Sequence, residues 1–306
     1  MTISIEPSGV SLGATVTSVR LGDLDPSEWA TIEEAFHEYG VLTFPKQFLS
    51  EEEQIGFAKR FGELEHVSVP ISNQRKDGSV LQDDAHRFWI LRGNERWHHD
   101  SSFMPLAAKA SSLTAMVVPS SGGQTEWADA RAGYDALDST TKEKLSSLCA
   151  RHSNYWSHEQ LGQPTHTGEG YGFHTFGAPL RPLVKIHPVT GRKAVYSGRH
   201  AYGIEGFSAE HSFTFLKELI ESIAQPPRVW GIDWEPGDFA IFDNRCIMHR
   251  VQPYDYSEPR VMRHTRVAGD PLTEFAPTVR DERADNYNPS TFAQEARVAA
   301  DQRSIA

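Results

Sequence analysis

Two kinds of metal ligand stand almost side by side in the segment Trp97-His98-His99-Asp100, and a further histidine follows much later in the chain at His249. In an extended segment, residues i and i+2 point to one face, so His98 and Asp100 converge while His99 points away. Two imidazoles and a carboxylate on one face of a metal ion leave three adjacent coordination positions open. Proteins hold an oxygen-activating, non-heme Fe(II) with this donor set, so we expect His98, Asp100 and His249 to bind one iron.

A candidate anchor for a co-substrate lies further along the chain. Fe(II) alone does not supply the electrons needed to cleave O2, whereas a 2-oxo acid supplies them by chelating the metal and losing CO2. If that acid is 2-oxoglutarate, its far carboxylate needs a buried cation. Arginine suits this role because its planar fork binds a carboxylate through two parallel hydrogen bonds. We expect Arg260, on a strand over 260–267, to be this anchor, with the Thr125 hydroxyl beside it.

The elements that must position these side chains are mostly short strands. Residues 3–19 alternate like a hairpin, and 110–118 reads as a strand. A tight turn is expected at Pro236-Gly237-Asp238. Two buried strands are expected after it, over Phe239 to Phe242 and over Cys246 to Val251. Many short strands with helices outside them indicate a mainly β, α+β domain built as a sandwich or barrel.

Helix starts are marked by capping residues. Asp25-Pro26-Ser27-Glu28 and Ser50 to Glu53 both have the capping-box pattern, and Gly40 and Gly62 are expected to end these two helices. Further helices are expected to begin at Asp129, Ser139 and Ser208. Two segments, 63–96 and 157–176, lack such signals. We expect the first to hold short strands and loops that include a substrate lid, and the second to be a long loop.

Composition limits the classes of function. The formal net charge of -11 argues against nucleic acid as a partner, because phosphate binding needs a basic surface. No apolar run approaches a membrane span, and the N-terminus lacks a signal-peptide pattern. Two cysteines in 306 residues favour free thiols in a reducing cytoplasm. We expect a single domain over residues 1–306, with a core at about 5–270 and a polar tail at 271–306.

The chain resembles the TauD/TfdA family of Fe(II)/2-oxoglutarate dioxygenases from about residue 5 to residue 270. The motifs that carry the resemblance are 97–103, Gly122-Gly123-Gln124-Thr125, 132–137, Gly237-Asp238 through Asp243-Asn244-Arg245, His249 and Arg260. The resemblance implies a double-stranded β-helix, that is, a cupin-like jelly roll whose mouth holds the iron. It also implies that His98, Asp100 and His249 hold Fe(II), that Thr125 and Arg260 hold 2-oxoglutarate, and that O2 is consumed.

Within the family the chain is most similar to the phenoxyalkanoate dioxygenases. The supporting segments are 13–17, Gly93-Asn94, 180–188, 198–201 and 259–262. This similarity implies a small anionic substrate, an aryloxyalkanoate whose hydroxylated ether carbon collapses to a phenol and an oxo acid, with succinate and CO2 as co-products. The rival hypotheses are a taurine, alkylsulfonate or alkyl sulfate dioxygenase, a zinc hydrolase, and a non-catalytic jelly-roll protein that binds a metal or an acid.

Four residues are candidates for contact with the substrate: Asn94, His200, Arg263 and His264. The taurine-type enzymes carry an arginine at the position of His264, so this departure weakens the sulfonate hypothesis. On a strand His264 shares a face with Arg260, whereas Arg263 points away, which favours His264. Each of the four has a structural alternative, either a loop hydrogen bond or core packing. We also expect the protein to form a homo-oligomer.

Overall fold

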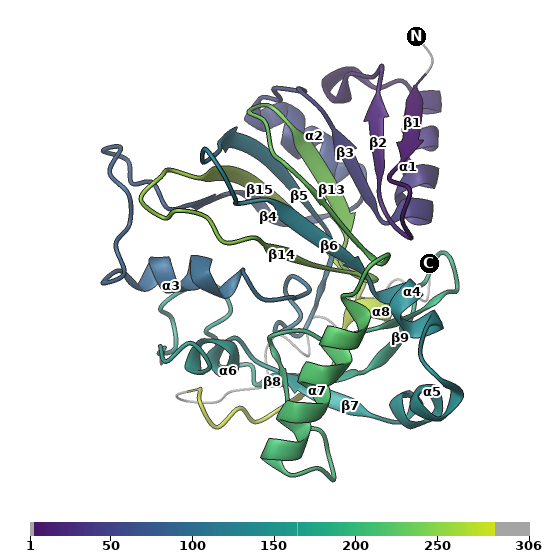
Figure 1. Ribbon diagram of the computed structural model, residues 1–306, viewed down its shortest axis with the longest axis vertical. Helices are drawn as coiled ribbons and strands as arrows, with labels where there is room; N and C mark the ends of the chain where they lie inside the picture. Colours follow the sequence, from purple (N-terminus) through teal and green to yellow (C-terminus); the bar gives the residue numbers. More distant parts are fainter. Residues whose placement is uncertain (1–2, 164, 285–306) are drawn as a thin grey trace.

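The computed structural model describes residues 3–163 and 165–284, which form two main sheets, two further sheets and flanking helices (Figure 1). The largest sheet has seven strands in the order β1-β2-β3-β13-β5-β15-β4. Its strands are β1 (Ser4–Pro7), β2 (Ala14–Thr17), β3 (Val41–Phe44), β13 (Phe239–Asp243), β5 (Ala108–Val117), β15 (Val261–Ala268) and β4 (Leu64–Ser72). All pairings in it are antiparallel except β2 with β3.

The second main sheet has three antiparallel strands: β12 (Val229–Ile232), β6 (Thr125–Asp129) and β14 (Ile247–Val251). The two further sheets are β11-β7-β8-β16, with four short strands, and β10-β9. Their strands are β7 (Cys149–His152), β8 (Ala178–Pro182), β9 (Val184–Ile186), β10 (Lys193–Val195), β11 (Ala201–Tyr202) and β16 (Thr278–Val279).

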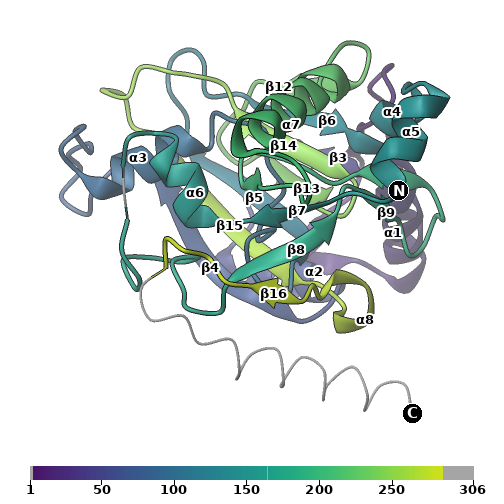
Figure 2. The ribbon, with the colours of Figure 1, turned by 90° about the horizontal axis from the view of Figure 1, so that it is seen from below.

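Helices α1 (Pro26–Tyr39) and α2 (Glu51–Lys59) cover the outer face of the large sheet. Both begin with the expected capping boxes, at Asp25 and Ser50. Gly40 ends α1 in the left-handed conformation, but α2 ends at Lys59, before Gly62. The short helix η1 (Leu21–Asp23) packs beside α2, with Leu21 in the same buried cluster. The other helices are α3 (His86–Gly93), α4 (Ala130–Asp135), α5 (Ser139–Ser146), α6 (Asn154–Glu159), α7 (Ala209–Ile223) and α8 (Pro271–Glu274) (Figures 1 and 2).

Strand β13 shows how the core is divided, because its side chains alternate between two buried clusters. Phe239 and Ile241 pack with the apolar faces of α1 and α2. Ala240 and Phe242 point the other way, into the cluster that includes Trp127 of the three-stranded sheet. The space between the two main sheets is therefore the core in which a site can be enclosed.

The structure differs from the sequence-based expectation in three places. Helix α3 forms inside the segment expected to be strands and loops, and its N-cap residue, Ala85, makes no side-chain cap bond that could have announced it. Helix α6 overlaps the start of the segment expected to be a long loop. The ordered chain also continues past residue 270, since Glu274 is buried and β16 pairs with β8. The rest of the expected tail, 285–306, lies outside the described residues. Among the residues described, no helix has the length and apolar character needed to cross a bilayer.

Candidate active site

His98 and His249 face each other across a single antiparallel bridge. The backbone amide of each donates to the carbonyl of the other, at 3.0 and 2.9 Å, and their ring centroids are 4.1 Å apart. The extended segment expected to carry His98 and Asp100 is therefore reduced to one bridged residue, His98. The chain then turns at Ser101, whose φ is 52°. His99 points away as expected, with its ring stacked on Tyr196.

The carboxylate of Asp100 completes the group of three. Its oxygens lie 4.0 Å from Nε2 of His98 and 3.8 Å from Nε2 of His249. These gaps are too wide for hydrogen bonds but narrow enough for one ion to bridge them. All three side chains are buried, and their ligand atoms all lie within 4.8 Å of one another.

The protonation states suit a cation. Burial lowers the pKa of His98 well below its ordinary value and that of His249 to about 4, so both imidazoles are neutral near pH 7. Burial alone would raise the pKa of Asp100, but Arg266 and the nearby imidazoles outweigh it and hold the pKa well below the usual range. Nδ1 of His98 lies 2.8 Å from the Arg96 carbonyl and donates its proton there, which leaves Nε2 with a free lone pair. The donor set therefore fits a divalent metal.

Arg260 and Thr125 lie on the wall of the same cavity. Nε of Arg260 donates to the Gly123 carbonyl at 3.0 Å, and no carboxylate of the described residues pairs with this buried guanidinium. The Thr125 hydroxyl accepts a hydrogen bond from Trp234 Nε1 at 3.0 Å, so its own proton remains available to an acceptor. Burial lowers the pKa of Arg260, so an anion beside it would be stabilising.

The cavity has a volume of about 480 Å³ and brings together eight of the nine predicted site residues: His98, Asp100, His249, Thr125, Arg260, Asn94, His200 and His264. His264 lies against the metal-ligand candidate, with Nε2 3.6 Å from Oδ2 of Asp100. Nδ1 of His200 contacts the Ser157 hydroxyl at 3.0 Å, and its ring packs on Phe103.

Arg263 is the residue that the structure does not bring to this cavity. It points from β15 toward α2, where its guanidinium donates to Gln54 Oε1 at 2.7 Å and to the Ser50 carbonyl at 3.2 Å. The alternation of side chains along β15 explains why Arg263 lies outside the cavity while its neighbour His264 lies inside it. His264 and Arg266 face inward, and Arg263 faces outward.

Arg199 is a cavity residue that the sequence reasoning missed. Its guanidinium is buried, and Nη2 donates to Oδ1 of Asn94 at 3.2 Å, but Nε and Nη1 have no partner among the described residues. Burial lowers its pKa to about 9, so it remains cationic at neutral pH. A Cβ on Gly93 would lie 1.9 Å from Nη1, so the glycine leaves the space that the guanidinium fills. The available signal was the neighbouring Gly198-Arg199-His200 segment, from which only the histidine was selected.

Arg266 and Ser111 were also missed, and both hold the Asp100 carboxylate. Nη2 of Arg266 donates to Oδ1 at 3.1 Å, and the Ser111 hydroxyl donates to Oδ2 at 2.6 Å. Arg266 lies two residues beyond His264 on the same face of β15, so the period of the strand could have identified it.

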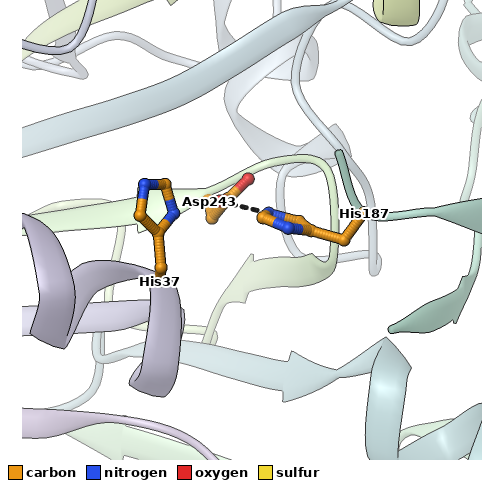
Figure 3. A group of neighbouring side chains, drawn as sticks. All are labelled: His37, His187 and Asp243. Atoms are coloured by element: carbon orange, nitrogen blue, oxygen red, sulfur yellow. Dashed lines mark hydrogen bonds and ion pairs between the residues drawn. The ribbon is translucent and has the colours of Figure 1, made fainter. Parts of the chain in front are cut away.

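His37, His187 and Asp243 form a second cluster whose ligand atoms lie close together (Figure 3). Figure 3 shows His187 pointing at Asp243, and their atoms are 3.0 Å apart. Nδ1 of His187 accepts from the Val189 and Thr190 amides, so Nε2 carries the donated proton and no lone pair is free. Arg245 forms a fork on both oxygens of Asp243 and repels a cation. This cluster ties α1, β9 and β13 together and is a poor metal site.

Comparison with known proteins agrees with this geometry. Residues 4–266 match the model of the family described as taurine catabolism dioxygenase TauD, TfdA family. The chain is 48% identical to an (S)-phenoxypropionate/alpha-ketoglutarate-dioxygenase of Sphingobium herbicidovorans over 89% of this chain and 97% of the relative. It is 36% identical to an alpha-ketoglutarate-dependent 2,4-dichlorophenoxyacetate dioxygenase of Cupriavidus pinatubonensis over 88% of this chain and 99% of the relative.

Among solved structures, the crystal structure of AAD-2 in complex with Mn(II) and N-oxalylglycine superposes with a TM-score of 0.83. That protein is 39% identical to the chain, and the match covers 92% of this chain and all of the other. The chain therefore belongs to the TauD/TfdA dioxygenase family.

Proposed function

We propose that this protein is an Fe(II)- and 2-oxoglutarate-dependent dioxygenase that hydroxylates an aryloxyalkanoate at the carbon bearing the ether oxygen. The hydroxylated carbon then loses the aryl oxygen as a phenol and becomes the carbonyl of an oxo acid, which is pyruvate for a 2-phenoxypropionate. One oxygen atom of O2 enters the substrate, and the other enters succinate as 2-oxoglutarate loses CO2. The near-full-length similarity to the phenoxypropionate and dichlorophenoxyacetate enzymes supports this class of substrate.

The observation that carries the proposal is one cavity lined by a three-donor metal set and by two arginines, Arg199 and Arg260, that pair with no carboxylate of the described residues. Two anions can therefore bind beside one metal. Against a net charge of -11, such a local concentration of positive charge favours small anionic organic acids.

His98, Asp100 and His249 hold the iron. When bound, the iron supplies the site at which 2-oxoglutarate and O2 are converted into the oxidant. Arg260 and Thr125 clamp the far carboxylate of 2-oxoglutarate, and Gly123 orients the Arg260 fork through its carbonyl. The structure of a relative with Mn(II) and N-oxalylglycine supports a metal and an oxalyl-type ligand in this fold.

Arg199 binds the carboxylate of the substrate, and Asn94 fixes the direction of the Arg199 guanidinium. His264 lies beside the Asp100 carboxylate, with Nε2 3.6 Å from Oδ2, and so takes a different place from an arginine that reaches the substrate. His200 packs beside His98 and shapes the wall. The apolar part of the wall, which includes Ile71, Ile90, Leu91 and Phe103, suits an aryl ring.

We also propose the fold type, the domain number and the oligomeric state of this protein. The two main sheets form the double-stranded β-helix of the family, and the described residues, 3–163 and 165–284, form one domain. The protein works as a homo-oligomer.

Anaerobic titration tests the proposal. Apoprotein is loaded with Fe(II) and 2-oxoglutarate, and the metal-to-ligand charge-transfer band is followed while (S)- and (R)-2-phenoxypropionate, phenoxyacetate, taurine and an alkyl sulfate are added. A phenoxy acid should shift the band, and admission of O2 should release phenol and succinate in equal amounts. Succinate formation with the alkyl sulfate or taurine alone would transfer the substrate assignment to those acids, and oxygen consumption independent of 2-oxoglutarate would contradict the reaction class.

A further inference from the structure

Ser101, directly after Asp100, has an unusual backbone. Its φ of 52° lies in the left-handed region, which residues with a Cβ rarely adopt. Its side chain is fully buried. A strained residue of this kind persists only where its surroundings hold it firmly, and such residues cluster at functional sites.

Two side chains, Glu65 and Arg266, hold Ser101 in place through its hydroxyl. Its hydroxyl donates to Oε2 of Glu65 at 2.7 Å and accepts from Nη1 of Arg266 at 2.8 Å. Through Nη2 the same Arg266 grips Oδ1 of Asp100. One guanidinium therefore fixes both the strained serine and the carboxylate that faces the histidines.

Tyr171 joins this group from a different part of the chain. It lies in the 165–177 loop, which leads into β8, and its hydroxyl donates to Oε1 of Glu65 and lies 2.9 Å from the Ser101 hydroxyl. We call Tyr171, Glu65, Ser101 and Arg266 the Tyr171 network. It joins the loop, β4, the Asp100 turn and β15.

The loop is shaped to bring Tyr171 to this point. Nδ2 of Asn154 donates to the Tyr171 carbonyl at 3.3 Å. Gly172 has a φ of 88°, and a Cβ there would lie 2.3 Å from the Phe103 ring. The tyrosine ring lies edge-on to His66, with the Arg266 guanidinium 5.3 Å from its centroid. Burial and the Glu65 carboxylate raise the pKa of Tyr171, so the hydroxyl keeps its proton and remains a donor.

We propose that Tyr171 is a positioning residue. Through the Tyr171 network, docking of the 165–177 loop fixes the Asp100 carboxylate in the orientation that binds metal. The inference rests on the proposed function only in taking Asp100 as a metal ligand. Because coupling between two binding events is reciprocal, metal binding must favour loop docking by the same factor by which docking favours the metal.

The first test is titration of full-length apoprotein with Co(II), without 2-oxoglutarate or substrate. Tyr171→Phe should raise the Kd for Co(II) by about three- to tenfold, below the effect expected for a direct partner of a ligand. Tyr155→Phe is the matched control. It removes a hydroxyl that contacts Thr167 and the His174 carbonyl of the same loop, and no hydrogen bond among the described residues links this hydroxyl to the Tyr171 network. Its Kd should stay closer to that of the wild type than the Kd of Tyr171→Phe does, because the Tyr171 network is intact in this variant.

The second test is hydrogen exchange of the peptide that spans 165–177. Co(II) should slow its exchange in the wild type and in Tyr155→Phe, but not in Tyr171→Phe. If Tyr171→Phe lowers the thermal midpoint of the apoprotein, Glu65→Gln is used in its place. This change removes the carboxylate charge of Glu65 at nearly constant size, and it should also raise the Kd for Co(II).

An unchanged Kd in Tyr171→Phe, or an equal rise in both tyrosine variants, would overturn the positioning role. These outcomes are separate from failure of the proposed function. If phenoxy acids are not oxidised, the Co(II) titration still reports on Tyr171, whereas a wild type that binds no Co(II) contradicts the metal site and this inference together.

Discussion

Arg199 and Arg260 line one cavity, and neither guanidinium pairs with a carboxylate of the described residues. A buried charge is costly unless it is paired, so each arginine is expected to gain much of its stabilisation from a bound ligand. Their hydrogen bonds differ. Arg260 is held through the Gly123 carbonyl and Arg199 through Asn94, which agrees with the different ligands proposed for the two guanidinium groups.

Exchange of each arginine for glutamine should separate the two ligands. Arg199→Gln should raise KM for the phenoxyalkanoate and lower kcat/KM by about 10- to 100-fold, the range for loss of a charge-assisted pair, with KM for 2-oxoglutarate nearly unchanged. Arg260→Gln should raise KM for 2-oxoglutarate and leave KM for the phenoxyalkanoate nearly unchanged. Steady-state kinetics with each substrate varied in turn measures both.

Arg263→Gln is the matched control for these two variants. Its guanidinium contacts Gln54 and the N-terminal end of α2, outside the cavity, so neither KM should change. A rise in KM for the phenoxyalkanoate in Arg263→Gln, together with a normal KM in Arg199→Gln, would reverse the assignment of the acid-binding group.

At the scale of elements, the site depends on how closely separate segments approach. Gly198 lies directly beside the His98 bridge, and a Cβ on it would be 2.9 Å from the His98 Cα. The backbone amide of Arg199 donates to the Trp97 carbonyl at 2.8 Å. These two contacts therefore position both a metal-ligand candidate and the arginine proposed to bind the substrate.

Two glycine variants test this dependence. Gly198→Ala should lower kcat/KM by about tenfold or more, because a small displacement of a ligand-bearing segment is costly to catalysis. Gly56→Ala, within α2, has open space around the new methyl group. It should stabilise the fold by about 1 kcal/mol and leave the kinetics unchanged. Urea unfolding measures the stabilities, and normal activity in Gly198→Ala would show that the approach is not critical.

At the scale of the whole molecule, several histidines are kept neutral by the fold. Burial, the largest cause in each case, lowers the pKa of His37 and His66 to about 4 and that of His158 to about 3. Because an unfolded histidine takes up a proton near pH 6.5, the unfolded state binds more protons than the folded state below that pH. Their contribution to stability is complete above about pH 6.5 and is lost as the pH falls toward 4.

The thermal midpoint of the apoprotein should therefore fall between pH 7 and pH 5. A loss of about 1 kcal/mol corresponds to about 2–4 °C for a chain of this size. The carboxylates with lowered pKa, such as Asp100 and Asp243, stay ionised across this window and do not oppose the trend. Calorimetry at a series of pH values measures the slope, and a midpoint that is flat or rises on acidification would contradict it.

Much of this protein is determined by local sequence. The caps at Asp25, Ser50 and Ser208 begin helices because each side chain bonds to amides only two or three residues away. The alternation along β15 sends His264 inward and Arg263 outward wherever that strand is placed. The ligand types at His98, Asp100 and His249 limit the metal chemistry by the nature of their donor atoms.

Only the tertiary structure decided which segments approach one another. Arg199 contacts Asn94, and the space for its guanidinium is left by Gly93. Tyr171 contacts Glu65. Each of these contacts joins two segments that lie far apart in the sequence. Helix α3 lacks a capping side chain, so packing rather than a local signal holds it beside the cavity. Local bonding and strand period act over a few residues and can be predicted from the sequence, whereas the pairing of a buried charge depends on where distant backbones come together.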